Sequence, residues 1–487
     1  MGSLMISISG VRGIVGESLT PELLMRMGEA FGTYARARRS AEKGGKQPPR
    51  VVVGRDTRVS GEMVKHSVFA GLLATGCSIV DLGVVTTPTA AMAVEHMGAD
   101  GGVVISASHN PIEWNALKFF GPDGVYLDSE QGKQLLDLYY QGDFRHARWN
   151  EIQEVVKDNA ASDEHLQKVL DIVDVEAIRA KKFRVALDSC NGAGVEITTR
   201  LLAELGCEAV RIHCTPDGIF PHDPEPTFLN LQDLCKLAGE EDVQVGFAQD
   251  PDADRLAVVD ENGRFIGEEY TLALAADYVL AGLGERGPGA GSREQSGPQT
   301  SDSQPLTPVV VINMSTSRAT EDVAARHGAQ CLRVPVGEVN VAVRMRALGA
   351  AIGGEGNGGV IDPRVHYGRD SLVGIAVILE HMATSNRDLS ELVADLPRYV
   401  IRKTKVELDR AKTADALAHL AEEAGGDGAR ANCEDGLRLD WADRWVHVRP
   451  SNTEPVVRVI AEATDEASVT ELVDSYVARI RRWGGEE

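Results

Sequence analysis

Short runs rich in Val and Ile alternate with segments of helical pattern along most of the chain. Alternation of this kind is typical of α/β layers with parallel or mixed sheets. Strands are expected at residues 50–53, 102–105, 184–187, 243–247, 309–312 and 350–352. Helices are expected among them at residues 21–39, 61–74, 192–205 and 317–328. The chain is therefore predicted to be an α/β protein.

Three of the predicted strands run directly into polar loops, in VVVGRD, VVISASHNP and VGFAQDPDADR. In open α/β sheets, ligands bind outside the carboxyl ends of the strands. These loops are therefore the first candidates for a functional site. Residues 284–308, in contrast, have almost no apolar side chains and are expected to be a flexible surface insertion.

The composition limits the partners of the chain. At 487 residues it has room for about three domains, with two or four also reasonable. Its 50 basic and 73 acidic residues give a formal charge of −23. Such a surface repels nucleic acid and anionic membranes, so an anionic substrate would need a local basic pocket. The seven cysteines form no C-x-x-C pair, and no long apolar run occurs, which favours reduced thiols, no membrane span and a cytoplasmic location.

The segment DPDADR places three carboxylates, Asp250, Asp252 and Asp254, on alternate residues directly after a strand. Alternate residues of an extended backbone project to one side, so the three can converge on one cation. Ligands that are all oxygen suit Mg²⁺ better than Zn²⁺. A solvated acidic turn would show the same pattern, but the strand end and the adjoining Arg255 favour a magnesium site.

The segment ISASHNPIEWNALK carries Ser108 and His109, with Lys118 further along. A serine beside a possible base can act as a nucleophile. No G-x-S-x-G sequence surrounds it, so a hydrolase triad is poorly supported. A turn or a helix cap is the structural alternative for such a loop.

A third loop, RPSNTEP, lies between two strand-like runs near the C-terminus. Arg, Ser, Asn and Thr side chains together with loop amides are typical donors to a phosphate. A surface β-turn would have a similar composition. The donors in question are Arg449, Ser451, Asn452 and Thr453.

A fourth loop, GGEGNGG at residues 353–359, is rich in glycine. Glycines let a backbone approach a ligand closely, and here they would present Glu355 and Asn357 for hydrogen bonding. The spacing does not match the G-x-G-x-x-G sequence of a dinucleotide site. Arg12, in VRGIVG, is a further cation in a glycine-containing loop, where a structural salt bridge is the alternative role.

Taken together, the four loops resemble those of the α-D-phosphohexomutases, the family of phosphoglucomutase, phosphomannomutase and phosphoglucosamine mutase. SASHNP is similar to the family's phosphoserine loop, DPDADR to its magnesium loop, GEGNGG to its sugar-recognition loop and RPSNTEP to its phosphate-binding loop. The resemblance spans essentially the whole chain. It implies three related α/β domains with mixed sheets and a smaller C-terminal α+β domain, around a central cleft. We expect these domains at residues 1–153, 154–256, 257–383 and 384–487.

The resemblance also implies a chemistry. Ser108 would carry a phosphoryl group and, with the three aspartates, hold one Mg²⁺. Hexose 6-phosphate would become hexose 1-phosphate through a hexose 1,6-bisphosphate that turns over within the cleft. Lys118 would be the general acid or base, Arg12 would lie beside the reacting phosphate, and His109 would support the loop or the phosphate. The expected contacts to the rest of the substrate are Arg255, Glu355, Asn357, Arg449, Ser451, Asn452 and Thr453.

The sugar loop departs from the G-E-M-S-G-H pattern of many phosphomannomutases. Asn357 stands at the Ser position and Gly359 at the His position, so no histidine of this loop can be the acid or base. GEGNGG, with VGEVNV at residues 336–341, looks more like phosphoglucosamine mutases. The expected substrate is therefore glucosamine 6-phosphate, with mannose or glucose phosphate as the alternative.

Two other classes of protein remain open from the sequence, a magnesium-dependent sugar phosphatase and a non-catalytic sugar-phosphate sensor. The separate sugar and distal phosphate loops argue against the first, and an intact serine with three aspartates argues against the second. A monomer or a homodimer is expected.

Overall fold

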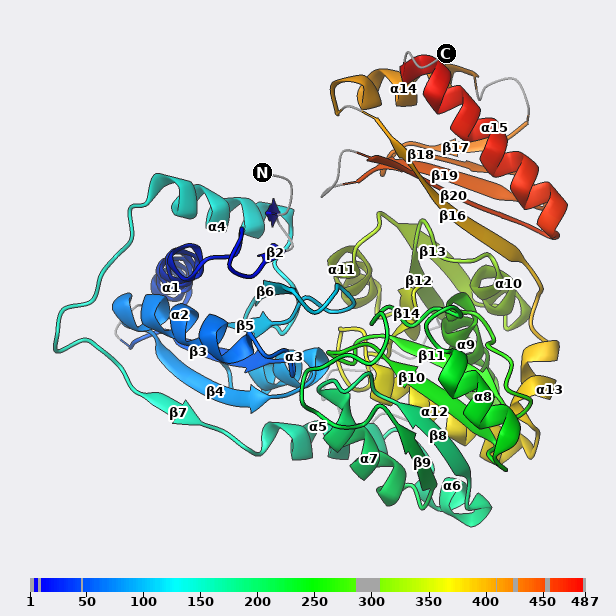
Figure 1. Cartoon of the computed structure of the whole chain (residues 1–487), viewed down its shortest axis with the longest axis horizontal. Coiled ribbons are helices and arrows are strands. Elements are labelled where there is room, and N and C mark those ends of the chain that lie inside the picture. Colours follow the sequence, from blue (N-terminus) through cyan, green and yellow to red (C-terminus); the bar gives the residue numbers. More distant parts are fainter. Residues whose placement is uncertain are drawn as a thin grey trace, which may run out of the picture.

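The structure is a computed structural model that describes residues 4–7, 10–44, 47–285, 307–408, 410–423, 428–451 and 456–484. It is built on four sheets, one of seven strands, two of four strands and one of five strands. Figure 1 shows the first sheet and its helices beside the second and third, with the fourth sheet above the third. Most of the insertion expected at residues 284–308 lies outside the described residues.

The first unit has the strand order β1-β2-β6-β5-β3-β4-β7. Val51 and Val53 of β3 belong to one buried cluster, with α1 and α2, whereas Val52 belongs to another, with α3. Three consecutive valines are therefore buried because helices cover both faces of the sheet. The elements are β1 (Met5–Ser7), β2 (Gly10–Ile14), α1 (Pro21–Lys43), β3 (Arg50–Arg55), α2 (Gly61–Ala74), β4 (Ser78–Val84), α3 (Thr87–His96), β5 (Gly101–Ile105), β6 (Trp114–Phe120), α4 (Ser129–Gln141) and β7 (Val155–Lys157).

The second and third units each have a sheet of four strands, in the orders β11-β10-β8-β9 and β13-β12-β14-β15. The second unit contains α5 (Ala161–Leu170), α6 (Val175–Lys181), β8 (Arg184–Asp188), α7 (Gly194–Glu204), β9 (Glu208–Ile212), α8 (Gln232–Glu240), β10 (Val245–Gln249) and β11 (Leu256–Asp260). The third contains α9 (Glu268–Glu285), β12 (Val309–Asn313), α10 (Ala319–Arg326), β13 (Gln330–Val334), α11 (Glu338–Leu348), β14 (Ile352–Glu355), β15 (Gly359–Ile361), α12 (Ser371–Ser385) and α13 (Leu389–Ala394).

One four-strand plan recurs in these three sheets. A first strand pairs in parallel with a second strand on one side and with a third on the other, and a fourth strand pairs antiparallel with the third. The four strands are β3 to β6 in the first unit, β8 to β11 in the second and β12 to β15 in the third. The predicted fold class, with three related α/β units and mixed sheets, is thus confirmed.

The fourth unit is a smaller α+β unit, also as predicted. Its sheet is antiparallel throughout, in the order β16-β20-β19-β18-β17. Its elements are β16 (Val400–Glu407), α14 (Arg410–Glu423), β17 (Arg430–Asn432), β18 (Leu437–Asp440), β19 (Trp445–Pro450), β20 (Val456–Ala463) and α15 (Glu466–Gly484).

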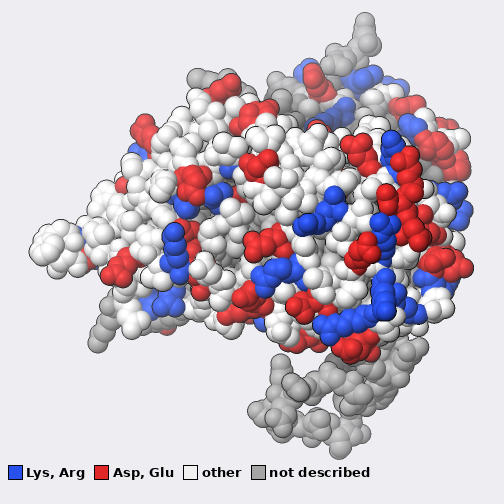
Figure 2. Space-filling view, turned by 60° about the horizontal axis from the view of Figure 1, so that its bottom comes forward, with Lys and Arg blue, Asp and Glu red and all other residues white. Residues whose placement is uncertain are grey.

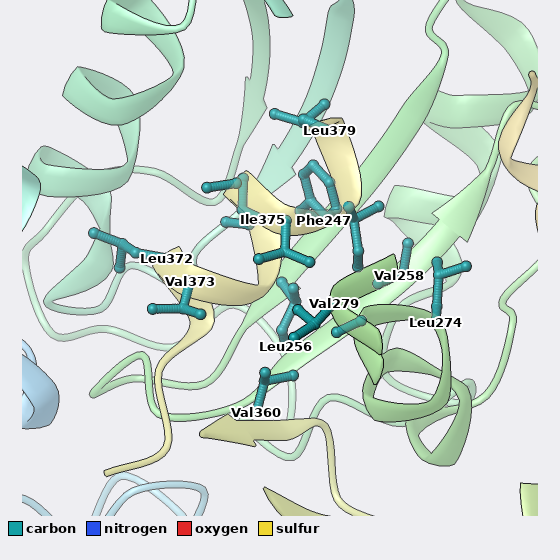
Figure 3. Close-up of a cluster of buried hydrophobic side chains, with 14 of the residues drawn as sticks. Phe247, Leu256, Val258, Leu274, Val279, Val360, Leu372, Val373, Ile375 and Leu379 are labelled. Atoms are coloured by element: carbon teal, nitrogen blue, oxygen red, sulfur yellow. The ribbon is translucent and has the colours of Figure 1, made fainter. Parts of the chain in front are cut away.

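The largest buried cluster joins the second and third units. Figure 3 shows Phe247 of the second sheet beside Ile375 and Leu379 of α12, and Leu256 of the same sheet beside Val360 of β15. A helix that is apolar on most of its surface, as α12 is, requires burial on all sides. This shared core fixes the second sheet relative to the third, and with it the loops that leave them.

None of the seven cysteines is in a disulfide. Among the residues described, no helix has the length and apolar character needed to cross a membrane. On the face shown in Figure 2, acidic and basic side chains are interspersed, so the net negative charge does not form a single acidic block there.

Candidate active site

The three N-terminal motif loops leave their sheets at the same point of the shared plan, between the third and fourth strands. SASHNP follows β5, DPDADR follows β10, and the sugar loop joins β14 to β15. Each third strand is part of a parallel set, and ligands bind outside the carboxyl ends of such strands. The repeated topology therefore explains why segments far apart in the sequence meet at one place.

They meet in a cleft of about 1000 Å³ that is lined by all four units. The predicted site residues that line this cleft are Arg12, Ser108, His109, Lys118, Arg255, Glu355, Asn357 and Arg449. Asp250, Asp252 and Asp254 are fully buried and contact Ser108 or Lys118 of this lining. Ser451 is buried in the fourth unit, and Asn452 and Thr453 lie outside the described residues.

Ser108 is held in an uncommon backbone conformation. Its φ is +49°, a region that costs a non-glycine residue energy and recurs at functional sites. Its amide donates to Ser106 Oγ at 2.9 Å, and its carbonyl accepts from Arg58 Nη2 at 2.6 Å. With the backbone fixed in this way, Ser108 Oγ donates to Asp250 Oδ2 at 2.5 Å.

Arg58 is a supporting residue that sequence reasoning missed. Its side chain is fully buried and also donates to the carbonyl oxygens of Asn110 and Pro111, both at 2.6 Å. Asn110 Oδ1 in turn accepts from Arg12 Nη1 at 2.6 Å. Arg58 lies in GRDTRVS, after a strand. This position indicates a cation in a loop, but it does not indicate that the partners of Arg58 lie about 50 residues away.

The three aspartates form a compact cluster. One carboxylate oxygen from each lies within 4.8 Å of the others. Burial, together with Asp254 and Asp252, raises the pKa of Asp250 well above its ordinary value. Oδ1 of Asp252 and Oδ1 of Asp254 are buried without a hydrogen-bond partner in the described part of the chain. Buried carboxylate oxygens without partners are costly, and an all-oxygen set suits a hard divalent cation, so these residues fit Mg²⁺.

Lys118 lies against the same cluster. Its Nζ is 2.6 Å from Asp252 Oδ2 and 3.6 Å from Asp254 Oδ2. Burial opposes its charge, but Asp252 and the other negative groups outweigh burial and raise the pKa of Lys118. Thr87, a residue that the sequence did not indicate, donates its hydroxyl to Asp252 Oδ2 at 2.5 Å. Lys118 is therefore a charged ammonium in this state.

His109 lies among positively charged side chains. Its Nδ1 is 3.3 Å from Ser108 Oγ. Burial, together with Arg255, Arg12 and Arg369, lowers the pKa of His109 well below its ordinary value. Burial and Arg255 likewise lower the pKa of Arg12. Cations that repel one another in a cleft favour an anion between them, as a phosphate would be.

Arg369 is a further residue that the sequence did not indicate, and it connects two of the motif loops. Its guanidinium is 2.6 Å from Asp254 Oδ2, 2.8 Å from Glu355 Oε2 and 3.0 Å from Glu338 Oε2. Glu338 lies in VGEVNV, and Arg369 directly precedes Asp370, the N-cap of α12. The sequence shows an Arg beside the N-cap of an apolar helix. That pattern does not indicate which three carboxylates the Arg contacts.

The sugar loop depends on its glycines. Gly358 has a φ of +83°, and a Cβ there would lie 2.3 Å from the carbonyl oxygen of Leu256. The loop can therefore approach the second unit only with glycine at this position. Glu355 Oε1 accepts from Asn313 Nδ2 at 2.8 Å, and Asn357 Nδ2 donates to Glu355 Oε2 at 3.4 Å. Burial would raise the pKa of Glu355, but Arg369 and Asn313 outweigh it and lower that pKa, so Glu355 is a carboxylate.

Comparisons with known proteins decide the family. Four phosphoglucomutase/phosphomannomutase family models match in chain order: alpha/beta/alpha domain I at residues 5–146, alpha/beta/alpha domain II at 163–263, alpha/beta/alpha domain III at 268–399 and the C-terminal domain at 404–479. A phosphoglucomutase/phosphomannomutase of Thermococcus kodakarensis is 40% identical over 96% of this chain and 96% of its own length. The chain belongs to the phosphoglucomutase/phosphomannomutase family.

Two further likenesses agree with this family. A probable phosphoglucosamine mutase of Methanopyrus kandleri is 37% identical over 97% of each chain. The crystal structure of a phosphoglucomutase/phosphomannomutase family protein from Burkholderia thailandensis has a TM-score of 0.80 and 28% identity, over 98% of this chain and 97% of that one. The predicted resemblance is confirmed, and as a phosphohexomutase the chain is an isomerase.

The fourth unit of this phosphohexomutase contributes a separate polar end of the cleft. Arg449 Nε is 3.0 Å from Asp435 Oδ2, which also accepts from the amide of Val336 at 2.9 Å. Lys403 of β16 pairs with Glu268 at 2.5 Å and Glu269 at 2.9 Å. Asp435 and Lys403 thus connect the fourth unit to the third, and neither carried a motif in the sequence.

Proposed function

We propose that this chain converts glucosamine 6-phosphate into glucosamine 1-phosphate, through a phosphoserine at Ser108 and a hexose 1,6-bisphosphate. The observation that carries the proposal is Ser108 Oγ, 2.5 Å from Asp250 and within a cleft whose cations come from separate units. Arg12 and Arg255 lie close enough to His109 to lower its pKa, and Arg449 belongs to the fourth unit. Two phosphate positions are what a bisphosphate intermediate requires.

The reaction would exchange one bond for another. The bond between phosphorus and Ser108 Oγ breaks while a bond forms to the free hydroxyl of the sugar phosphate, and the hydroxyl proton ends on Ser108 Oγ. Lys118, charged and close to this centre, would donate a proton to Ser108 Oγ as its bond to phosphorus breaks, and would regain one from the sugar hydroxyl. After the bisphosphate turns over, the same steps in reverse return the other phosphoryl group to Ser108.

Charge compensation would supply most of the rate. A phosphoserine carries about two negative charges at neutral pH. Mg²⁺ bound by the three aspartates and an oxygen on Ser108 would neutralise part of that charge and polarise the phosphoryl group. His109, uncharged at neutral pH, would hydrogen-bond the phosphoryl group or its loop without adding a further repelling cation.

The sugar is the finer part of the proposal. Relatives carry both kinds of name, phosphoglucomutase/phosphomannomutase and probable phosphoglucosamine mutase. The acidic side chains that line the cleft favour a substrate with an ammonium group at C2. They are Glu225, Glu268, Glu269, Glu338, Glu355 and Asp435. Mannose or glucose phosphate is the alternative with the same mechanism. The seven unpaired thiols support a cytoplasmic location.

The test compares kcat/KM for glucosamine, mannose and glucose 6-phosphates, with Mg²⁺ and a trace of the matching bisphosphate. We expect the highest value for glucosamine 6-phosphate. Ser108→Ala should lose at least about 10³-fold in kcat, as expected when a nucleophile is removed. Ser67→Ala, on α2 outside the cleft, is the matched control and should retain activity. Release of inorganic phosphate would indicate a phosphatase, and binding without turnover would indicate a sensor.

A further inference from the structure

A second cluster of metal-ligating side chains lies in the second unit, outside the proposed magnesium site. Asp188 ends β8, His213 follows β9 directly, and His222 lies in the loop before α8. His213 Nδ1 is 2.8 Å and His222 Nε2 is 3.2 Å from the same atom, Asp188 Oδ2. One ligating atom of each residue lies within 4.8 Å of the others. We call these three residues the His–Asp cluster.

The hydrogen bonds around the cluster prepare it for a positive charge. His222 Nδ1 is 2.8 Å from the carbonyl oxygen of Asp223, which can only accept, so Nδ1 carries a proton. Nε2 therefore faces the Asp188 carboxylate either with a second proton or with a lone pair directed at a shared cation. The amide of Cys190 occupies Asp188 Oδ1 at 2.9 Å, which leaves Oδ2 for the rings.

Backbone strain gathers at this cluster. In the part of the chain that the structure describes, seven non-glycine residues have positive φ. Two of them end helices, and Ser108 and Ala253 belong to the serine and magnesium loops. The other three are Cys190, Asn191 and His213. Strained backbone concentrates at functional sites, and here it brings His213 to Asp188.

The cluster is also open, unlike the other histidine–aspartate group. His165 and His366 both bond Asp370 Oδ2, but both rings are buried and their other nitrogens contact Thr89 Oγ1 and the Gly368 amide. That arrangement is closed and satisfied. In contrast, the side chains of His213 and His222 are 22% and 15% exposed. An ion could reach them and complete its shell with water.

We propose that Asp188, His213 and His222 bind a divalent transition ion of the zinc class, separate from Mg²⁺. Two imidazole nitrogens and one carboxylate suit Zn²⁺ or Co²⁺, whereas the all-oxygen aspartate cluster suits Mg²⁺. The bond from His222 to the Asp223 carbonyl is the outer contact that orients a metal-binding imidazole. The ion would fix residues 213–231, whose Phe220 lies 4.8 Å from the Arg58 guanidinium that holds the Ser108 loop.

The test titrates Co²⁺ into the metal-free full-length chain while excess Mg²⁺ occupies the carboxylate site. We expect one equivalent with the visible d–d absorption of nitrogen-bound cobalt, displaced by Zn²⁺. His222→Asn and Asp188→Asn should each remove that absorption, with circular dichroism reporting their folding. His66→Asn is the matched control, because that side chain is 75% exposed on α2, and it should keep the absorption.

Two results would overturn the proposal. One is that the wild-type chain shows no absorption of nitrogen-bound cobalt, a result that can be interpreted without any variant. His222 would then be only a protonated partner of Asp188. The other is absorption lost in Asp252→Asn but kept in His222→Asn. Neither readout uses the mutase reaction, so the proposal stands or falls separately from the proposed function.

Discussion

Replacing Arg369 by Met would leave three buried carboxylates without their shared cation. Arg369 is 9% exposed and contacts Asp254, Glu355 and Glu338 within 3.0 Å. Removing one partner of a buried ion pair costs about 3–5 kcal/mol, because the remaining charge is uncompensated. Methionine fills a similar length, so the loss of charge dominates over the loss of volume.

That cost converts into a shift in thermal unfolding. The core shared by the second and third units makes them one cooperative body of about 200 residues, for which 1 kcal/mol lowers Tm by about 2–4 °C. Arg369→Met should therefore lower Tm by at least about 6 °C at pH 8 without Mg²⁺. The control is Arg387→Met, whose partner Asp395 is 59% exposed; such a pair contributes about 1 kcal/mol or less.

The loss should also depend on pH. Burial already raises the pKa of Glu338. Without Arg369, the carboxylates of Asp254, Glu338 and Glu355 repel one another without compensation, so they take up protons at a higher pH. At pH 5.5 more of these groups are neutral, so the Tm difference between wild type and variant should shrink relative to pH 8. A Tm loss no larger than that of the control, or one that is equal at both pH values, would show that Arg369 does not compensate the charge of these carboxylates.

Three further outcomes are expected. Gly358→Ala should lower Tm more than Gly349→Ala, because both have positive φ but only the first meets a backbone oxygen; equal losses would contradict this. In the metal-free folded chain the pKa of Asp250 is raised, so this carboxyl group resists ionisation. The increase in Tm on adding Mg²⁺ should therefore grow as pH rises through that pKa. An increase in Tm that becomes smaller as pH rises would contradict this prediction. Burial raises the pKa of Glu269 to about 7, so wild-type stability should fall as pH rises from about 5 to 8, and Glu269→Gln should flatten that profile; unchanged slopes would exclude this cause.

The sequence was enough to predict the fold class and the loops, because each motif is contiguous and follows a strand. Ser108, Asp250 and Glu355 could be identified in this way without knowledge of their neighbours. The common position of their loops, between the third and fourth strands of a repeated sheet, became visible only in the structure. The domain boundaries and the roles of individual site residues stay predictions.

The residues that hold these loops together were not predictable for a physical reason. Arg369 contacts Asp254 across 115 positions of sequence, and Thr87 contacts Asp252 across 165. Their local sequences satisfy helix caps and turns equally well, so nothing local distinguishes a supporting contact from an ordinary one. Only packing between the units brings such partners within hydrogen-bond distance.

In the proposed reaction Ser108 carries the transferred phosphoryl group. The most direct measurement incubates the full-length chain with Mg²⁺ and labelled hexose 1,6-bisphosphate, and maps the label by peptide mass spectrometry. We expect one labelled phosphoryl group, on the peptide that contains Ser108. It should leave again when glucosamine 6-phosphate is added, and the label should appear in bisphosphate or 1-phosphate. Label on another residue, or labelled inorganic phosphate with none on the protein, would contradict it.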